Sequence, residues 1–306
     1  MAQNKNDVLK AEILDLKQQR NAVILAHNYQ RGEVQDIADF VGDSLDLSQN
    51  AAKTDADVIV FCGVHFMAET AVILSPKKVV LLPDANAGCP MADMITAERL
   101  IERKNELNNA RVVCYVNSSA AVKAESDVCC TSANGVKVVR ILDSDEILFV
   151  PDENLGKFVS LKTGKRLHLW TGFCPTHMKI KEQHIIDARQ QYPDAKVIVH
   201  PECRPEVIAL ADQALSTSGM CTFARETEAR EVVIGTEVGI LYRLRKENPQ
   251  KRFIAATEEA ICPTMKLITL EKIMRTLQRM EPRVQVPEIA RLRAHAAVDR
   301  MIEIGR

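Results

Sequence analysis

The sequence predicts an α/β protein of three similar αβα three-layer domains with parallel sheets, related by a pseudo-threefold axis around a central site. The first observation behind this prediction is that three cysteines directly precede a proline, at spacings of 85 and then 88 residues: Cys89, Cys174 and Cys262. The second is that short apolar runs recur at the same period. The third is that a loop bearing Ser or Thr recurs within each period.

The apolar runs predict three strands in each period. The first strand ends in polar residues: NAVILAHNY (21–29), ARVVCYVNSS (110–119) and AKVIVHPEC (195–203). The second strand follows a loop that carries Ser44, Ser132 or Thr217: DVIVFCG (57–63), EILFVPD (146–152) and EVVIGTE (231–237). The third strand leads into Cys-Pro: 78–90, 166–175 and 251–263. Near-continuous apolar strands that alternate with helical segments are typical of parallel sheets covered on both faces.

Each period therefore predicts strand, helix, hydroxyl-bearing loop, helix, strand, helix, strand, Cys-Pro and a further helix. The length of 306 residues fits two or three domains. We place the domains and their flanking segments as follows: an N-terminal helix at 1–19, the repeats at 20–108, 109–193 and 194–281, and a C-terminal helical tail at 282–306.

Charge and hydropathy restrict the class of partner. A formal net charge of −1 argues against a nucleic-acid partner or an anionic membrane surface. The start, MAQNKNDVLKAEILDLKQQR, has a helical period and does not resemble a signal peptide. Apolar runs such as VIVFCGV are too short to cross a membrane. We therefore expect a cytoplasmic protein, whose nine cysteines stay reduced and form no disulfide framework.

The three Cys-Pro pairs predict a metal site. Because Pro favours the first position of a helix, each Cys is expected to cap a helix, whose positive end lowers the pKa of the thiol. Three thiolates are too few for an ordinary four-thiolate zinc site. They suit zinc with an open position, or a four-iron cluster in which one iron lacks a protein thiolate. A small buried side chain is the alternative for any single Cys, but three sites in register disfavour it.

Polar side chains at the strand ends predict a shared pocket, because ligands of α/β sheets bind beyond the carboxyl ends of the strands. Two periods place a histidine, His27 or His200, at the same repeat position, and we match Asn117 to it in the other period. The hydroxyls of Ser44, Ser132 and Thr217 either cap helices or bind anions there.

Further acid–base groups lie close by in the sequence. His177, three residues after Cys174, is either a pocket residue or a partner of that cysteine. Together with the tyrosines and Glu202, these side chains suit dehydration or condensation chemistry on small polyanionic substrates.

Ten short segments between residues 26 and 266 together resemble the quinolinate synthase family of bacterial NAD synthesis. They occur in the family's order: AHNYQ, DIADFVGDSL, PDANAGCPMADMI, CYVNS, CCTSAN, GFCPTH, HPEC, STSGM, EVGILYRL and CPTMK. The resemblance implies three αβα domains around a [4Fe-4S] cluster. It also implies condensation of iminoaspartate with dihydroxyacetone phosphate to quinolinate, with loss of phosphate and two waters.

The resemblance also implies roles for individual residues. The cluster ligands map onto Cys89, Cys174 and Cys262, and an iron without a protein ligand would act as a Lewis acid. The substrate-binding positions map onto His27, Ser44, Tyr115, Asn117, Ser132, His200, Glu202 and Thr217. The catalytic candidates are His27, Tyr29, Tyr115 and Glu202. Some family members carry C-x-x-C-x-x-C at the last ligand, but Ala256 and Glu259 occupy the two earlier places here, so no redox switch of that kind is expected.

Two other functions stay open from the residues alone. One is a different [4Fe-4S] hydro-lyase that acts on small polyanions. The other is a non-enzymatic three-layer α/β binding protein with a structural metal. The expected partners are the two small-molecule substrates, and the lability of iminoaspartate is compatible with an aspartate-oxidising enzyme as a further partner.

Overall fold

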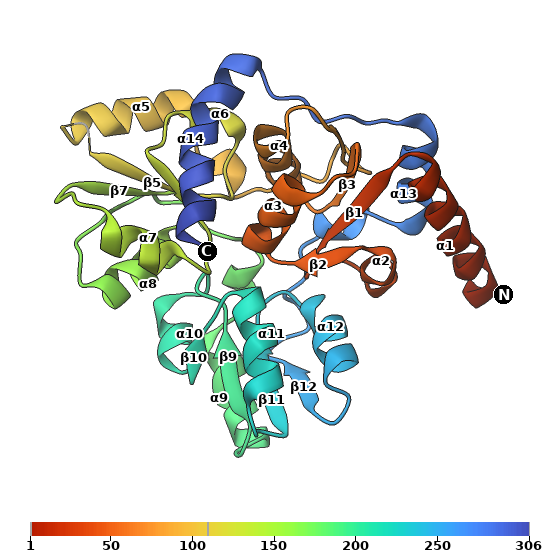
Figure 1. The fold of residues 1–306 in the computed structure, drawn as a ribbon. Coiled ribbons are helices and arrows are strands. Elements are labelled where there is room, and N and C mark those ends of the chain that lie inside the picture. Colours follow the sequence, from red (N-terminus) through yellow and green to blue (C-terminus); the bar gives the residue numbers. More distant parts are fainter. Residues whose placement is uncertain (1, 109, 306) are drawn as a thin grey trace.

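Three parallel four-stranded sheets form the framework of the molecule, and all three have the same strand order (Figure 1). The computed structural model describes residues 2–108 and 110–305. The orders are β2-β1-β3-β4, β6-β5-β7-β8 and β10-β9-β11-β12. We call the segments β1 to α5, β5 to α9 and β9 to α13 the first, second and third units.

The three units contain the same elements in the same sequence. The first unit comprises β1 (Ala22–His27), α2 (Gly32–Ile37), β2 (Phe40–Gly42), α3 (Ser44–Lys53), β3 (Val58–Cys62), α4 (His65–Leu74), β4 (Val79–Leu81), the 3₁₀ helix η1 (Ala92–Met94) and α5 (Ala97–Glu106). The second comprises β5 (Arg111–Tyr115), α6 (Ala120–Ala124), β6 (Val128–Cys130), α7 (Gly135–Ile141), β7 (Ile147–Val150), α8 (Glu153–Thr163), β8 (His168–Leu169), η2 (His177–Lys179) and α9 (Glu182–Gln191). The third comprises β9 (Lys196–Val199), α10 (Pro205–Ala209), β10 (Gln213–Ala214), α11 (Thr217–Glu226), β11 (Glu231–Gly235), α12 (Ile240–Glu247), β12 (Arg252–Ala255), η3 (Met265–Leu267) and α13 (Leu270–Arg279).

The predicted α/β class and the three similar parallel units are confirmed. The register also repeats, since the last paired residues of the two central strands are Ala26 with Cys62, Cys114 with Val150, and Val199 with Gly235. A pseudo-threefold axis that relates the units stays a prediction, as do the domain boundaries. Residues 1, 109 and 306, where some of those boundaries fall, lie outside the described residues.

Each unit has one more strand than the sequence predicted. The additional strands β2, β6 and β10 lie at the edges of their sheets and contain only two or three residues. Strands this short show no period of apolar residues, so the sequence did not distinguish them from the loops that carry Ser44, Ser132 and Thr217.

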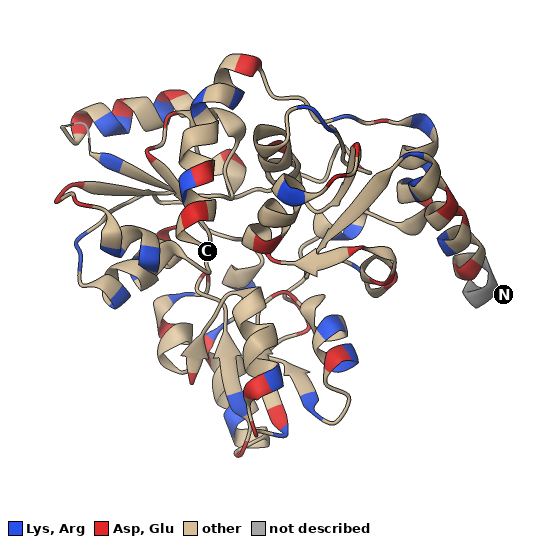
Figure 2. Ribbon diagram, viewed as in Figure 1, with Lys and Arg blue, Asp and Glu red and all other residues tan. Residues whose placement is uncertain are grey.

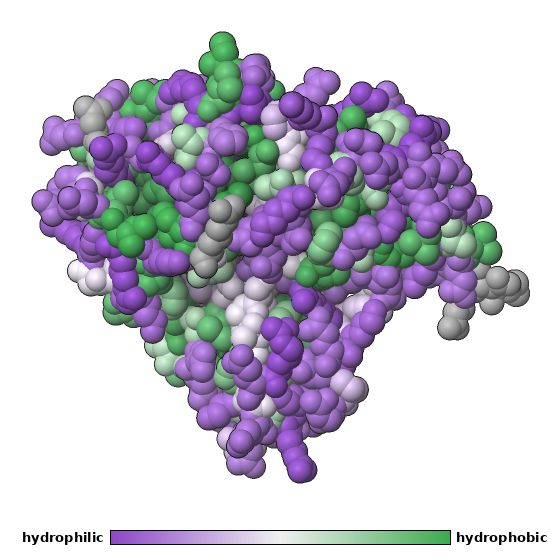
Figure 3. Space-filling model, in the orientation of Figure 1, coloured by the Kyte–Doolittle hydropathy of each residue, from purple (hydrophilic) through white to green (hydrophobic). Residues whose placement is uncertain are grey.

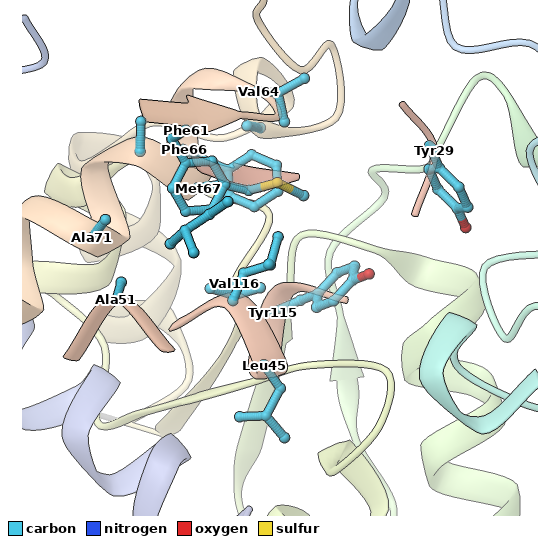
Figure 4. Packing of buried hydrophobic residues seen from close by; sticks show 14 of the residues in the cluster. Tyr29, Leu45, Ala51, Phe61, Val64, Phe66, Met67, Ala71, Tyr115 and Val116 are labelled. Atoms are coloured by element: carbon cyan, nitrogen blue, oxygen red, sulfur yellow. The ribbon is translucent and has the colours of Figure 1, made fainter. Parts of the chain in front are cut away.

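The core is aliphatic, as the low aromatic content of 4% requires. The central strands β3 and β7 are buried along their whole length. In Figure 4, Val64, Phe66 and Met67 pack against one another at the start of α4, and the hydroxyl of Tyr115 points toward the side on which Tyr29 lies. The apolar packing thus ends at a polar region.

The chain termini bind the units to one another. Helix α1 (Ala2–Gln19) packs on α13, and α14 (Glu288–Ile304) packs on α4 of the first unit and α6 of the second. Residues that precede α14 extend the first sheet beyond β4, where the N–H of Val284 donates to the carbonyl of Val80 at 2.9 Å. The extension covers an edge that would otherwise expose unpaired backbone groups.

The outer surface carries charges of both signs, which alternate over the face shown in Figure 2. On the same face hydrophilic residues predominate, and the apolar areas are separated from one another (Figure 3). In the described part of the chain, no helix has both the length and the apolar character that crossing a membrane requires.

Candidate active site

A cavity lies where the carboxyl ends of the strands of all three units meet, and the space in it that no protein atom fills, including the part open to solvent, is about 640 Å³. All the site residues predicted from the sequence line it: His27, Tyr29, Ser44, Cys89, Tyr115, Asn117, Ser132, Cys174, His200, Glu202, Thr217 and Cys262. His177, for which two interpretations were open, lines it too. Val64, Phe66 and Met67 form part of its apolar wall.

Hydrogen bonds to the first strands show which residues of the three units correspond. Asp39, Asp127 and Asp212 each accept a bond from a strand N–H, at 2.8, 2.8 and 2.7 Å. The donors are Ile24, Val112 and Val197, and the residues three positions further on are His27, Tyr115 and His200. Tyr115 therefore corresponds to the two histidines, and the match of Asn117 to them was wrong. Asn117 corresponds to Tyr29 and Glu202, because the register is shifted by two residues.

Local backbone bonds hold both histidines in one tautomer. The N–H of Tyr29 donates to Nδ1 of His27, and the N–H of Glu202 donates to Nδ1 of His200, both at 3.2 Å. Burial lowers the pKa of each imidazole to about 3, so both are neutral at physiological pH. Nε2 then carries the proton, and that of His200 lies 3.2 Å from the Ser132 hydroxyl. Each histidine offers a neutral N–H donor to the cavity.

Glu202 connects several of the cavity's polar side chains. It is 3% exposed and accepts the Tyr115 hydroxyl at 2.6 Å and His177 Nδ1 at 2.6 Å. Burial alone would raise the pKa of Glu202, but the electrostatic interactions with His177 and His200, and the hydrogen bonds from His177 and Tyr115, outweigh burial and hold it well below its ordinary value. Because a carboxylate only accepts, His177 must carry a proton on Nδ1.

A chain of hydroxyls continues from His177 to Tyr29. Nε2 of His177 lies 2.8 Å from Oγ1 of Thr236, and that oxygen lies 2.6 Å from the Tyr29 hydroxyl. When Nε2 of His177 is the acceptor, Tyr29 donates to Thr236 and Thr236 donates to Nε2. Burial, followed by the charge of Glu202, raises the pKa of Tyr29 well above its ordinary value, so Tyr29 holds its proton. Carboxylate, imidazole and hydroxyl follow the order of a hydrolase triad.

The segments that follow the three Cys-Pro pairs differ from the prediction in their local structure. A 3₁₀ turn, and not an α-helix, follows each Cys-Pro pair. The turn ends at a buried isoleucine in extended conformation (Ile95, Ile180 or Ile268), and the α-helix starts only after it. Burial of the isoleucine explains why the chain leaves the helical path there.

The pKa values of the Cys89 and Cys174 thiols also move against the prediction. Burial raises the pKa of Cys89 to about 12, and the backbone N–H groups of the turn lower it by less than burial raises it. Burial likewise raises the pKa of Cys174 well above its ordinary value, and the charges of Glu202 and Cys89 add to this effect. The negative charge of Cys262 disfavours the Cys89 thiolate. Three thiolates together at this site therefore require a cation to offset their repulsion.

Two buried carboxyls behind the cysteines were missed by sequence reasoning. Oε1 of Glu237 accepts the N–H of Cys262 at 3.1 Å and lies 2.9 Å from Lys266 Nζ. Asp152, after the corresponding strand of the second unit, accepts the N–H of Leu155 at 2.7 Å, and its negative charge contributes to the raised pKa of Cys174. Both carboxyls, like Thr236, are among the first polar residues after a buried strand, which was the available signal.

The cavity hydroxyls are not helix caps. Asp43 caps α3 through the N–H groups of Leu45 and Asp46, and Ser216 caps α11. Ser44 and Thr217 are the first helical residues after these caps. The residues directly before Ser44 and Thr217 are therefore the helix caps, and the two hydroxyls are available to a ligand.

Asp43 gives a prediction for the pH dependence of stability. Burial, followed by the charge of Asp46, raises its pKa from 3.8 to about 6. A carboxyl whose pKa is higher in the folded state favours folding most below its unfolded pKa, and this contribution is lost as the pH rises through the folded pKa. Asp43→Asn keeps an oxygen for the cap but removes the charge. We expect the variant to exceed the wild type in free energy of unfolding by roughly 1–3 kcal/mol at pH 8, and by less at pH 5.

Urea unfolding at both pH values measures this difference. Asp194→Asn, at an exposed carboxylate, is the matched control and should leave the pH profile unchanged. If the free energies of unfolding of Asp43→Asn and the wild type differed by the same amount at both pH values, ionisation of Asp43 would not destabilise the folded protein.

Comparisons with known proteins agree with this geometry. The family model for the quinolinate synthetase A protein matches residues 11–303. The chain is 57% identical over 298 residues to quinolinate synthase of Dehalococcoides mccartyi strain CBDB1, covering 97% of this chain and 99% of the relative. It is 59% identical over 300 residues to that of Geobacter metallireducens, covering 98% and 99%. It is 54% identical over 298 residues to quinolinate synthase 1 of Methanosarcina acetivorans, covering 97% and 98%.

Proposed function

The chain belongs to the quinolinate synthetase A protein family, and from this premise we propose that it condenses iminoaspartate with dihydroxyacetone phosphate to quinolinate, phosphate and two waters. Membership makes the chain an enzyme of NAD biosynthesis and removes the non-enzymatic binding protein from consideration. The observation that carries the proposal is the convergence of three thiols, acid–base groups and anion-binding hydroxyls from three units on one cavity. The reaction balances without an oxidant or a reductant.

The family and the cavity's donor groups indicate a metal cofactor, and we propose that it is a [4Fe-4S] cluster held by Cys89, Cys174 and Cys262. All three cysteines are only partly buried and line the cavity. Three thiolates match a cluster with one iron free of protein ligands, which supplies a Lewis acid when bound. Cys174, His177 and Glu202 have ligand atoms within 4.8 Å of one another, which would also suit a single ion. The ratio of iron and sulfide to protein separates the two alternatives.

The chain's own residues are proposed to bind the anionic groups and to move protons. The hydroxyls of Ser44, Ser132 and Thr217, with the neutral N–H donors of His27 and His200, suit the carboxylates and the phosphate. Oδ1 of Asn117 is buried and has no hydrogen-bond partner among the described residues, so it would accept a hydrogen bond from a substrate N–H or O–H.

The chain from Tyr29 to Glu202 is proposed to take up the proton released during enediol formation. A substrate proton would transfer to the Tyr29 oxygen, while the Tyr29 proton moves to Thr236 and the Thr236 proton moves to Nε2 of His177. Glu202 would stabilise the resulting imidazolium, and Tyr115 would hold Glu202 in place. The apolar wall with Phe66 and Met67 limits the access of water to the intermediates.

Removal of any one of the three cavity hydroxyls should weaken substrate binding. Loss of one hydrogen bond to a charged group costs roughly 1.5–3 kcal/mol, or about one to two decades in affinity. Ser44→Ala, Ser132→Ala and Thr217→Val should therefore each raise KM for at least one substrate by that amount and keep the metal content normal. Steady-state kinetics under anaerobic conditions measure the change. Unchanged KM for both substrates in all three variants would show that these hydroxyls do not bind the anions.

The decisive experiment supplies the anaerobically purified, metal-loaded protein with the two substrates. We expect quinolinate and phosphate in equal amounts, and no quinolinate when either substrate is omitted. Because iminoaspartate is labile, an aspartate-oxidising enzyme in the same reaction is its natural source. Turnover of another hydroxy acid, without quinolinate formation, would instead indicate a hydro-lyase.

A further inference from the structure

Asn28 lies directly behind the cavity and bridges the first and third units. It follows β1, and its side chain is fully buried. Nδ2 of Asn28 donates to Oγ1 of Thr217 at 2.9 Å, and Nη1 of Arg243 donates to Oδ1 of Asn28 at 2.9 Å. The amide therefore stands between a guanidinium on one side and a cavity hydroxyl on the other.

The direction of both bonds is fixed by Arg243. A guanidinium has donors and no acceptor, so it must face the amide oxygen, and the amide nitrogen must face Thr217. Arg243 is itself held in place, since Nη1 also donates to the carbonyl of Val41 at 2.7 Å and Nε donates to Glu247 at 2.6 Å. The orientation of the Asn28 amide thus follows from the fold.

The amide in turn sets the role of the Thr217 hydroxyl. A hydroxyl that accepts a bond from Asn28 keeps its own proton for another partner. Thr217 is 3% exposed and lines the cavity, so the cavity is where that partner would lie. The charge on Arg243 polarises the amide and thereby makes the Thr217 proton a better donor.

We propose that Asn28, oriented by Arg243, is a positioning residue that makes Thr217 a hydrogen-bond donor to a carboxylate or phosphate of the ligand. This assignment rests on the proposed function, because it takes the ligand of the cavity to be anionic. Asn28 does not line the cavity, but it would affect ligand affinity through its hydrogen bond to Thr217, which does line it.

Asn28→Asp and Asn28→Ala distinguish this role from a structural one. Asp has the same shape and keeps the bond to Arg243, but its carboxylate only accepts, so Thr217 must donate its proton to Asp and present a lone pair to the ligand. Ala loses both bonds and leaves the hydroxyl free to rotate. The positioning role predicts weaker ligand binding for Asn28→Asp than for Asn28→Ala, although Asn28→Asp unfolds at the higher temperature. A purely structural role predicts the opposite order for binding.

The probes are quinolinate and inorganic phosphate, titrated into the metal-loaded full chain by anaerobic calorimetry. We expect Asn28→Asp to weaken the binding of at least one probe about 10-fold or more. Asn248→Asp is the matched control and should leave the affinity unchanged, because Asn248 is buried, its side-chain amide donates to the Leu244 carbonyl, and it is not one of the residues that line the cavity.

Because Asp also introduces a negative charge, the measurement is repeated in a Thr217→Val background. If Asn28 acts through the hydroxyl, Asn28→Asp has little further effect once that hydroxyl is gone. An equal loss in both backgrounds, or weaker binding by Asn28→Ala than by Asn28→Asp, would overturn the assignment to Asn28. Failure of the wild-type protein to bind quinolinate would instead overturn the proposed function.

Discussion

Replacement of Cys89, Cys174 or Cys262 by serine should abolish stable binding of the proposed iron–sulfur cluster. Each change removes one of three thiolates, and Cys62 and Cys114, which are wholly buried in strands β3 and β5, are in no position to replace it. We expect bound iron to fall from about four per chain to well below one after anaerobic reconstitution, with complete loss of quinolinate formation. Iron and sulfide analysis measures the effect, and circular dichroism verifies that the variants are folded.

The matched control for this prediction is another cysteine close to the same cavity. Cys203 follows Glu202 in the sequence, but its side chain is fully buried and bonds the carbonyl of Gly235. Cys203→Ala should leave bound iron near the wild-type amount. A requirement for Cys203 as strong as that for Cys89 would contradict the assignment of ligands by their repeat position.

Glu202→Gln should lower kcat by roughly 10²–10⁴ while the cluster remains bound. Tyr115 and His177 both donate to the carboxylate, but an amide has one oxygen and must donate on its other side. If His177 accepts from the amide, Nδ1 loses its proton and Nε2 gains one, so Nε2 no longer accepts from Thr236. The proposed path for protons from Tyr29 would then be interrupted, although the shape of the site is retained.

Single-turnover kinetics and iron analysis on the same sample test this prediction. Glu206→Gln makes the same change at an exposed carboxylate four residues further on, and it should keep the wild-type kcat. A Glu202→Gln enzyme with full kcat and a normal cluster would exclude the path through His177 from the mechanism.

The longer strands and many of the cavity residues could be predicted from the sequence for one physical reason. A buried parallel strand must be apolar, so the first polar residues after it mark the carboxyl edge of the sheet, where ligands bind. His27, Tyr115 and His200 each follow such a run. The period in the sequence then placed the corresponding residues of three units at one cavity.

Long-range contacts account for what the sequence did not reveal. Thr236 belongs to the site because its hydroxyl lies between Tyr29 and His177, which come from the other two units. The direction of the Thr217 hydroxyl depends on Arg243 through Asn28, and the three residues are far apart in the sequence. Likewise, burial in the folded state decides the thiol pKa values, against the local effect of the turn from which they were predicted.

Helix α14 imposes an order on the biogenesis of the enzyme. It is the last helix that the structure describes, yet it packs between the first two units, where the Met301 carbonyl accepts the Asn134 side chain at 2.9 Å. During translation the first two units emerge well before the segment that joins them, and Cys262 also emerges long after Cys89 and Cys174. Until Cys262 and α14 have emerged, the nascent chain neither joins its first two units through α14 nor offers all three thiols to a metal. Assembly of a metal centre that uses all three cysteines is therefore a late step, which follows the synthesis of all three units.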